Sequence, residues 1–125
     1  MNNIADQIIG NTTNEITITK TNPAALAKIG SFVNGDLAYV LTSPELRHAA
    51  FYLIKRGESN VGWMRIRRDN TLGEIEVLPE VQKQGIATRA LELYYGERDF
   101  RYSFPTEAGE KLMARFSNAS VEDMQ

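Results

Sequence analysis

Residues 81–91 read VQKQGIATRAL and carry the most specific pattern in the chain. A polar, amide-rich segment meets Gly85 and passes without a break into an amphipathic, helix-like run. It directly follows residues 72–78, LGEIEVL, where Glu74 and Glu76 alternate with apolar residues as they do in a β-strand. The sequence therefore predicts a strand, a glycine-containing loop and a helix in immediate succession.

The loop has the composition of an anion site. A helix that begins at Gly85 leaves its first backbone N–H groups without partners inside the helix, at the positive end of the helix dipole. Glycine lets the backbone approach a ligand closely. Lys83 adds a cation, Gln82 and Gln84 add neutral amide donors, and Ala87 keeps the first turn small. These features suit a phosphate or pyrophosphate group, although neither a Walker loop nor a GxGxxG motif is present.

The N-terminal half predicts a strand, a helix and a meander of strands. Residues 15–20, EITITK, alternate as a strand does, and a helix is expected from Thr21 or Asn22 to a stop at Gly35. Residues 37–41 fit either a strand or a helix. Short turns then separate three strand candidates, which indicates antiparallel pairing. These candidates are residues 49–55, 61–67 and 72–78.

The C-terminal half predicts a helix, a short strand and a second helix. The first helix is expected over residues 85–98, the strand over 100–104, and the second helix begins with Thr106 as its cap. The unit over residues 72–104 is a strand–helix–strand, which implies a parallel, right-handed crossover. The predicted fold is therefore α+β, with a mixed sheet made of an antiparallel meander followed by strand–helix–strand–helix.

Length and composition set outer bounds. The chain has 125 residues, 42% of them hydrophobic and 24% charged, which predicts one domain over residues 1–125. The ends, residues 1–12 and 117–125, are candidates for flexible segments. With no cysteine and a single histidine, His48, no metal site is expected. A formal net charge of -2 speaks against nucleic acid as a partner. The absence of a long apolar run or signal peptide predicts a soluble, cytoplasmic protein without membrane contact.

One stretch within residues 72–95, IEVLPEVQKQGIATRALELYY, resembles the acetyl-coenzyme A motif of the GCN5-related N-acetyltransferases, the GNAT family. That motif runs from a strand through a proline-containing turn to Gln/Arg-x-x-Gly-x-Gly/Ala and then a helix. Gln82, Gly85 and Ala87 match its three marked positions, and Pro79 falls where members often carry proline. The rest of the chain fits the family's order of elements more loosely.

The resemblance implies a GNAT-like mixed sheet and an enzyme that moves an acetyl group from acetyl-CoA to a primary amine. In the family, backbone amides of the loop hold the cofactor's pyrophosphate, and the preceding strand binds the pantetheine arm. By resemblance, the cofactor-binding residues here are Val77, Gln82, Lys83, Gln84, Gly85, Ile86, Ala87, Thr88 and Ser103. The acceptor is a protein or a small molecule, and the short segments on the acceptor side favour an open groove and a macromolecular amine.

The family often places an acid on or near the strand before the loop, as a general base. Glu74 and Glu76 lie on one side of that strand by its period of two, and Glu76 is closer to the expected thioester. The alternative is that both face solvent or pair with Arg65 and Arg67 across the meander. The last helix has no tyrosine to protonate the leaving thiolate, which puts that step in doubt.

Two other functions stay open from the sequence. The same fold could serve as a non-catalytic acyl-CoA-binding module. Alternatively, residues 81–85 are only a polar loop in a small interaction or nucleic-acid-binding domain. The sequence does not decide between a monomer and a homodimer.

Overall fold

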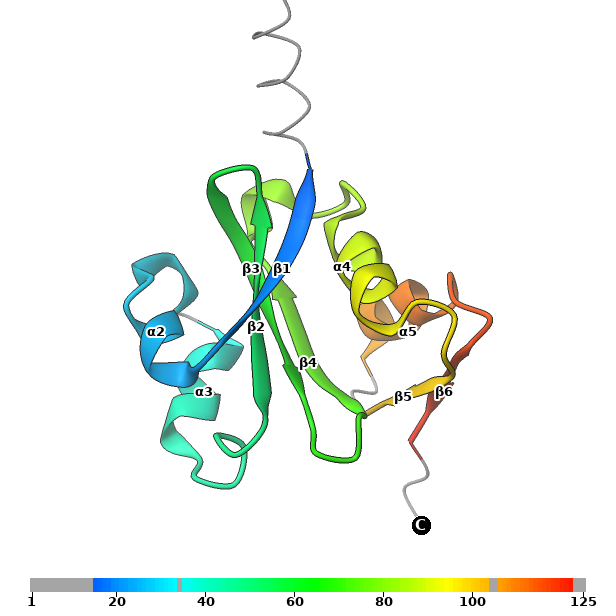
Figure 1. The fold of residues 1–125 in the computed structure, drawn as a ribbon, viewed down its shortest axis with the longest axis horizontal. Coiled ribbons are helices and arrows are strands. Elements are labelled where there is room, and N and C mark those ends of the chain that lie inside the picture. The colour runs from blue at the N-terminus through cyan, green and yellow to red at the C-terminus, as the bar shows by residue number, and fades with distance from the viewer. Residues whose placement is uncertain (1–14, 34, 104–105, 123–125) are drawn as a thin grey trace, which may run out of the picture.

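The computed structural model describes residues 15–33, 35–103 and 106–122. In this part of the chain, six strands form one sheet in chain order (Figure 1). They are β1 (Ile16–Thr21), β2 (Ala50–Arg56), β3 (Ser59–Ile66), β4 (Leu72–Val77), β5 (Phe100–Tyr102) and β6 (Ala119–Val121). Strands β1 to β4 are antiparallel, whereas β4, β5 and β6 run parallel. The predicted α+β fold, with a meander followed by a parallel strand–helix–strand unit, is confirmed.

Helices cover both faces of the sheet. Figure 1 shows α2 and α3 on one face and α4 and α5 on the other. The described helices are α2 (Pro23–Ala27), α3 (Asp36–Thr42), α4 (Ile86–Tyr95) and α5 (Glu107–Met113), with single 3₁₀ turns at η1 (Gly30–Phe32) and η2 (Pro79–Val81). None of these helices is long and apolar enough to cross a membrane.

Side chains of the central strands alternate between two layers of core. Phe51 and Trp63 pack under α2 and α3 together with Leu37. Met64, the next residue of β3, points the other way and packs against Leu91 of α4. Because neighbouring strand residues point to opposite faces, the side chains of β4 also divide between the two layers.

The single helix predicted from residue 21 or 22 to Gly35 is wrong. Asn22 does cap a helix, since its side chain accepts a hydrogen bond from the Ala25 N–H at 2.9 Å. That helix, however, ends at Ala27, and the chain turns so that Phe32 reaches the same core as the helix. Burial of Phe32 outweighs the local helical pattern. Gly35 precedes α3 instead of ending a helix, and the ambiguous residues 37–41 lie within α3.

The C-terminal elements are shorter than predicted. Helix α4 ends at Tyr95 instead of Arg98, because Gly96, with φ +61°, redirects the chain. Strand β5 covers only the start of the predicted strand over residues 100–104. The predicted cap is confirmed, since Thr106 Oγ1 accepts a hydrogen bond from the backbone N–H of Gly109 at 3.0 Å.

Strand β6 lies in the segment expected to be a flexible tail, residues 117–125. Ala119 pairs with Phe100 of β5 in parallel register, and the carboxylate of Glu122 lies 2.7 Å from Nη1 of Arg67. These contacts join residues far apart in sequence. A strand of only three residues, such as β6, therefore carries no local sequence signal. The other segment expected to be flexible, residues 1–12, lies outside the described residues.

Candidate functional site

Strand β4 has one closed and one open side. It pairs with β3 along its length, but on the β5 side only Leu72 and Tyr102 pair within the described residues. The Leu78 N–H donates to β3, and backbone groups of successive strand residues point to opposite sides. The N–H and C=O groups of Ile75 and Val77 therefore point toward the open side, as they would to bind an extended ligand.

The loop after β4 is tied to the sheet by two glutamines. Nε2 of Gln82 donates a hydrogen bond to the backbone C=O of Val77 at 2.9 Å, so the loop folds back on the strand that precedes it. Oε1 of Gln84 accepts a hydrogen bond from a guanidinium N–H of Arg56, at the end of β2. These bonds fix the path of the loop between β4 and α4.

The loop turns into α4 through left-handed backbone. Lys83 has φ +67° and Gly85 has φ +78°, and no heavy atom lies within 4 Å of the position that a Cβ on Gly85 would take. The Arg89 N–H donates to the Gly85 C=O at 3.0 Å, so the amides of residues 86–88 precede the first intrahelical bond. Consecutive N–H groups at an open helix start can bind an anion.

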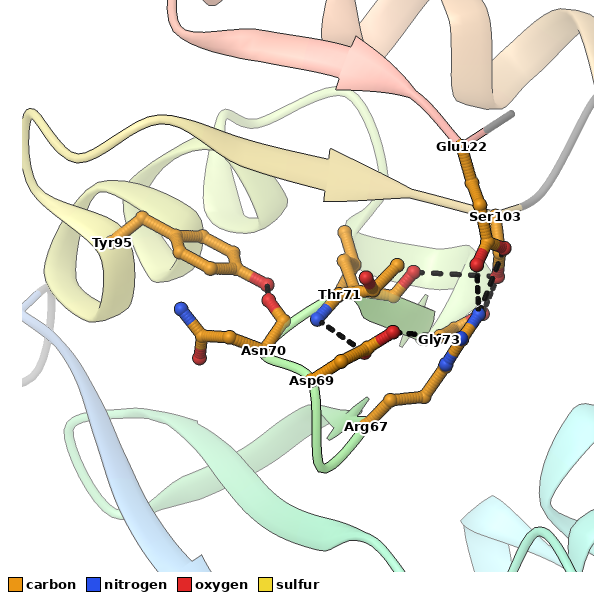
Figure 2. Close-up of polar contacts among 9 residues, drawn as sticks. Arg67, Asp69, Asn70, Thr71, Gly73, Tyr95, Ser103 and Glu122 are labelled. Atoms are coloured by element: carbon orange, nitrogen blue, oxygen red, sulfur yellow. Dashed lines mark hydrogen bonds and ion pairs between the residues drawn. The ribbon is translucent and has the colours of Figure 1, made fainter.

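The predicted cofactor residues fall into two places. Val77, the loop and the first turn of α4 lie together at one end of β4, although the side chain of Ile86 is buried in the core and offers only its amide. Ser103 lies at the other end of β4. Its hydroxyl is 3.4 Å from the Leu72 C=O and 3.5 Å from the Gly73 C=O (Figure 2).

The two predicted catalytic glutamates share the face that carries α2 and α3. In the register of β3 and β4, Glu74 lies opposite Arg65 and Glu76 opposite Trp63. Oε1 of Glu74 is 2.6 Å from Nε of Arg65, in an ion pair whose side chains are 17% and 8% exposed. The expected pairing with Arg65 is thus observed for Glu74, whereas Arg67 pairs with other carboxylates.

Glu76 is held by a different set of groups. Its Oε1 accepts a hydrogen bond from the indole N–H of Trp63 at 2.9 Å. Its Oε2 lies only 2.6 Å from the position that a Cβ on Gly35 would take, and Gly35 has φ +116°. This carboxylate therefore sits at the start of α3, and the residue at position 35 is glycine both for its backbone and for this close approach.

Burial raises the pKa of both glutamates. For Glu76, the hydrogen bond from Trp63 lowers the pKa by less than burial raises it, and the charges of Asp36 and Glu74 raise it further. For Glu74, burial also raises the pKa, against the lowering effect of the hydrogen bond and charge of Arg65. A carboxylate with a raised pKa takes up a proton more readily at neutral pH, as a general base must.

Trp63 was not among the site residues predicted from the sequence, so its contact with Glu76 was missed. A signal was present, because counting back from a turn at residues 68–71 pairs residue 63 with residue 76. The role of Gly35 had no such signal, because it depends on how α3 docks on the sheet. No group of three or more potential metal ligands converges within the described part of the chain.

No known family profile matches the sequence, and no curated protein matches it. Among solved structures, the chain is similar to the aminoglycoside N-acetyltransferase AAC(6')-Iy in complex with CoA. The two share 16% identity and a TM-score of 0.53 over 89% of this chain and 92% of that chain. The chain has the GNAT fold. A GNAT-family acetyltransferase from Streptococcus pneumoniae TIGR4 also matches, at 19% identity over 89% of this chain and 77% of that chain. Its TM-score of 0.43 is too low to support a conclusion about the fold.

At this level of identity the likeness establishes the GNAT fold and nothing beyond it. The fold predicted from residues 72–95 is therefore confirmed. Within this GNAT fold, the open side of β4 and the start of α4 lie together, and Glu76 lies on the opposite face of β4 from α4.

Proposed function

We propose that the protein is an acetyl-CoA-dependent N-acetyltransferase that acts on a primary amine. The observation that carries the proposal is the open side of β4 beside the unpaired amides of α4. An extended amide-containing arm can pair with the strand while its phosphates reach the helix start. The GNAT fold supports this use of the two features.

The proposed cofactor lies along β4. Its pyrophosphate is held by the amides of residues 86–88 with the side chain of Lys83 nearby, and Gly85 leaves the approach open. Its pantetheine amides pair with the backbone of Ile75 and Val77. The arm extends along β4 toward Ser103, whose hydroxyl lies at the other end of the strand. The Val77 C=O already accepts a bond from Gln82, so its N–H is the group left for the ligand.

Glu76 is the proposed general base. The amine must lose a proton as its nitrogen attacks the thioester carbonyl, and the carboxylate of Glu76 takes that proton. The new C–N bond forms, the C–S bond breaks, and the thiolate of coenzyme A leaves and is protonated by solvent. Glu74 is less suited, because its ion pair with Arg65 stabilises the charged carboxylate.

The test is release of free coenzyme A thiol together with mass analysis of the amine product. We expect Glu76→Gln to lower kcat by about 10² or more, the usual scale for loss of a general base. Glu74→Gln is the matched control on the same strand and face, and a smaller effect is expected. Equal losses in the two variants would remove Glu76 from the role of base.

A second candidate function is a non-catalytic acyl-CoA-binding module. Two observations favour it. Helix α5 has no tyrosine to protonate a leaving thiolate, and both glutamates of β4 are already held in contacts within the fold. Cofactor binding without thiol release on any amine would establish this alternative.

A further inference from the structure

A pocket of about 480 Å³ lies between the connection from α3 to β2 and the end of β3. Its wall includes Glu45, His48, Arg65, Arg67, Arg68 and Asp69. Arg65 lies opposite Glu74 in the sheet register, and directly paired residues point to the same face. The pocket therefore opens on the face of β4 that carries the two glutamates, away from α4.

Arg65 brings a buried charge to this pocket. It is only 6% exposed, and it is held by the ion pair between its Nε and Glu74. Its Nη1 and Nη2 make no hydrogen bond or ion pair with any described residue. A Cβ on Gly73 would lie 2.6 Å from the guanidinium carbon, so the glycine gives this group its room. Two fixed N–H₂ groups are thus left to serve the pocket.

The other cations of the wall differ in how they are held. Arg67 is fixed by Asp69 at 2.8 Å and by Glu122 at 2.7 Å (Figure 2). The side chains of Arg68 and His48 are exposed and make no contact of this kind with the described residues. Three arginines face four carboxylates here, counting Glu74 and Glu122 behind the wall. The charges nearly cancel. Binding of an anion in this pocket therefore depends on directed N–H donors and not on the net electrostatic potential.

We propose that this pocket binds the anionic group of the acceptor, and that the acceptor is a small zwitterionic amine with a carboxylate or phosphate at its other end. The inference rests on the proposed function, because it places the amine at Glu76. Glu76 and Glu74 are two strand residues apart, roughly 7 Å, and Arg65 contacts Glu74. The amine and the anion are therefore separated by a distance on the order of 7 Å, as in ω-amino acids. The proposed acceptor is therefore a small molecule and not the macromolecular amine expected from the short acceptor side.

The test compares ε-aminocaproate with its primary amide, which keeps the amine and the length but lacks the charge. We expect kcat/KM to be roughly tenfold higher for the acid, the scale of one charge-assisted hydrogen bond. In Arg65→Lys, which keeps a positive charge opposite Glu74 but removes the two N–H₂ groups, this ratio falls toward one. Arg115→Ala, an exposed arginine outside the pocket, is the matched control and keeps the ratio. Aminopentyl phosphate in the same assay tells whether phosphate or carboxylate is the better anion.

Failure of the inference and failure of the proposed function give different results. Equal rates on acid and amide, with thiol release from both, overturn the zwitterionic acceptor and leave the acetyltransferase in place. If no amine causes release of the thiol, NMR titration with ε-aminocaproate shows whether the pocket binds an anion. Shifts at the amides of Arg67 and Arg68 that vanish in Arg65→Lys support an anion site. Absence of such shifts overturns it.

Discussion

The indole N–H of Trp63 donates a hydrogen bond to Oε1 of Glu76 at 2.9 Å. Trp63 is fully buried, so this carboxylate is the partner that satisfies its N–H inside the core. The other oxygen of Glu76 lies against Gly35 at the start of α3. One carboxylate therefore joins the central strands to the α2–α3 layer and is fixed in orientation by them.

Trp63→Phe removes this donor and keeps an aromatic ring. A partly buried carboxylate that loses a hydrogen bond is destabilised, and we expect a loss of about 1–3 kcal/mol in the free energy of unfolding. The pKa of Glu76 should rise further, because the bond from Trp63 is the larger of two contacts that lower it, the other being a hydrogen bond from the backbone of Leu37. The acid limb of the kcat/KM profile then moves to higher pH. In a Glu76→Ala background, which has no acceptor for the indole N–H, the same change should cost less, and an equal cost would show that the bond contributes nothing.

Stability should fall as pH rises through the titration of Glu76. Burial raises the pKa of Glu76 above 4.5 in the folded state, so the folded protein holds this proton more tightly than the unfolded chain does. The resulting stabilisation is complete below 4.5 and is lost as pH rises through the folded pKa. Glu76→Gln removes this dependence. The difference in unfolding free energy between variant and wild type should grow from acid toward neutral pH in urea titrations, and a constant difference would contradict the raised pKa.

Gly35→Ala tests the close approach of Glu76 to the chain. The backbone at Gly35, with φ +116° and ψ -147°, is a conformation that side chains rarely adopt, at a cost of order 1–3 kcal/mol. The new Cβ would also lie 2.6 Å from the carboxylate oxygen. Gly30→Ala is the control, since its Cβ would meet nothing within 4 Å and its φ is not positive. Similar unfolding free energies for the two variants would contradict the close approach of the Glu76 carboxylate to Gly35.

Tyr95→Phe tests how α4 holds the β3–β4 turn. The Tyr95 hydroxyl donates to the backbone C=O of Asn70 at 2.9 Å, and Figure 2 shows the ring reaching this turn. Loss of the bond should lower the unfolding free energy by about 0.5–1.5 kcal/mol. Tyr39→Phe, at a side chain that is 64% exposed, should change it little. Calorimetric melting of both variants measures the difference in stability. Equal stability would show that the hydrogen bond from Tyr95 to Asn70 does not stabilise the fold.

Local patterns in the sequence were enough for the central unit of the fold. The alternation of Glu74 and Glu76, the turn at Pro79 and the glycine before α4 all lie within a few residues of one another. Such neighbours determine strand, loop and helix without help from the rest of the chain. The choice of face for each strand side chain follows from the same period of two.

Features that depend on distant residues could not be predicted in the same way. The break after Ala27 exists because Phe32 is buried under the sheet, and β6 exists because Ala119 meets Phe100. The pocket wall combines residues from the connection before β2 with the end of β3. Each of these contacts forms only when the chain has folded, so no local period or motif encodes it.

The proposed function depends above all on the start of α4 serving as the anion site of an acetyl-CoA-binding cleft. Isothermal titration calorimetry with acetyl-CoA tests it most directly, with Gly85→Glu as the probe and Gly96→Glu as its matched control. Both glycines have positive φ, are exposed and have no heavy atom within 4 Å of a new Cβ, but they lie at opposite ends of α4. The two variants therefore add the same charge. The backbone strain is greater in the control, because Gly96 has φ +61° and ψ -128°, whereas Gly85, with φ +78° and ψ +9°, is in the left-handed helical region that other residues can also adopt.

We predict that wild type and Gly96→Glu bind acetyl-CoA with similar affinity and that Gly85→Glu does not bind, because its carboxylate occupies the approach to the amides and repels phosphate. A wild-type protein that does not bind acetyl-CoA would contradict the account, and so would equal binding by the two variants.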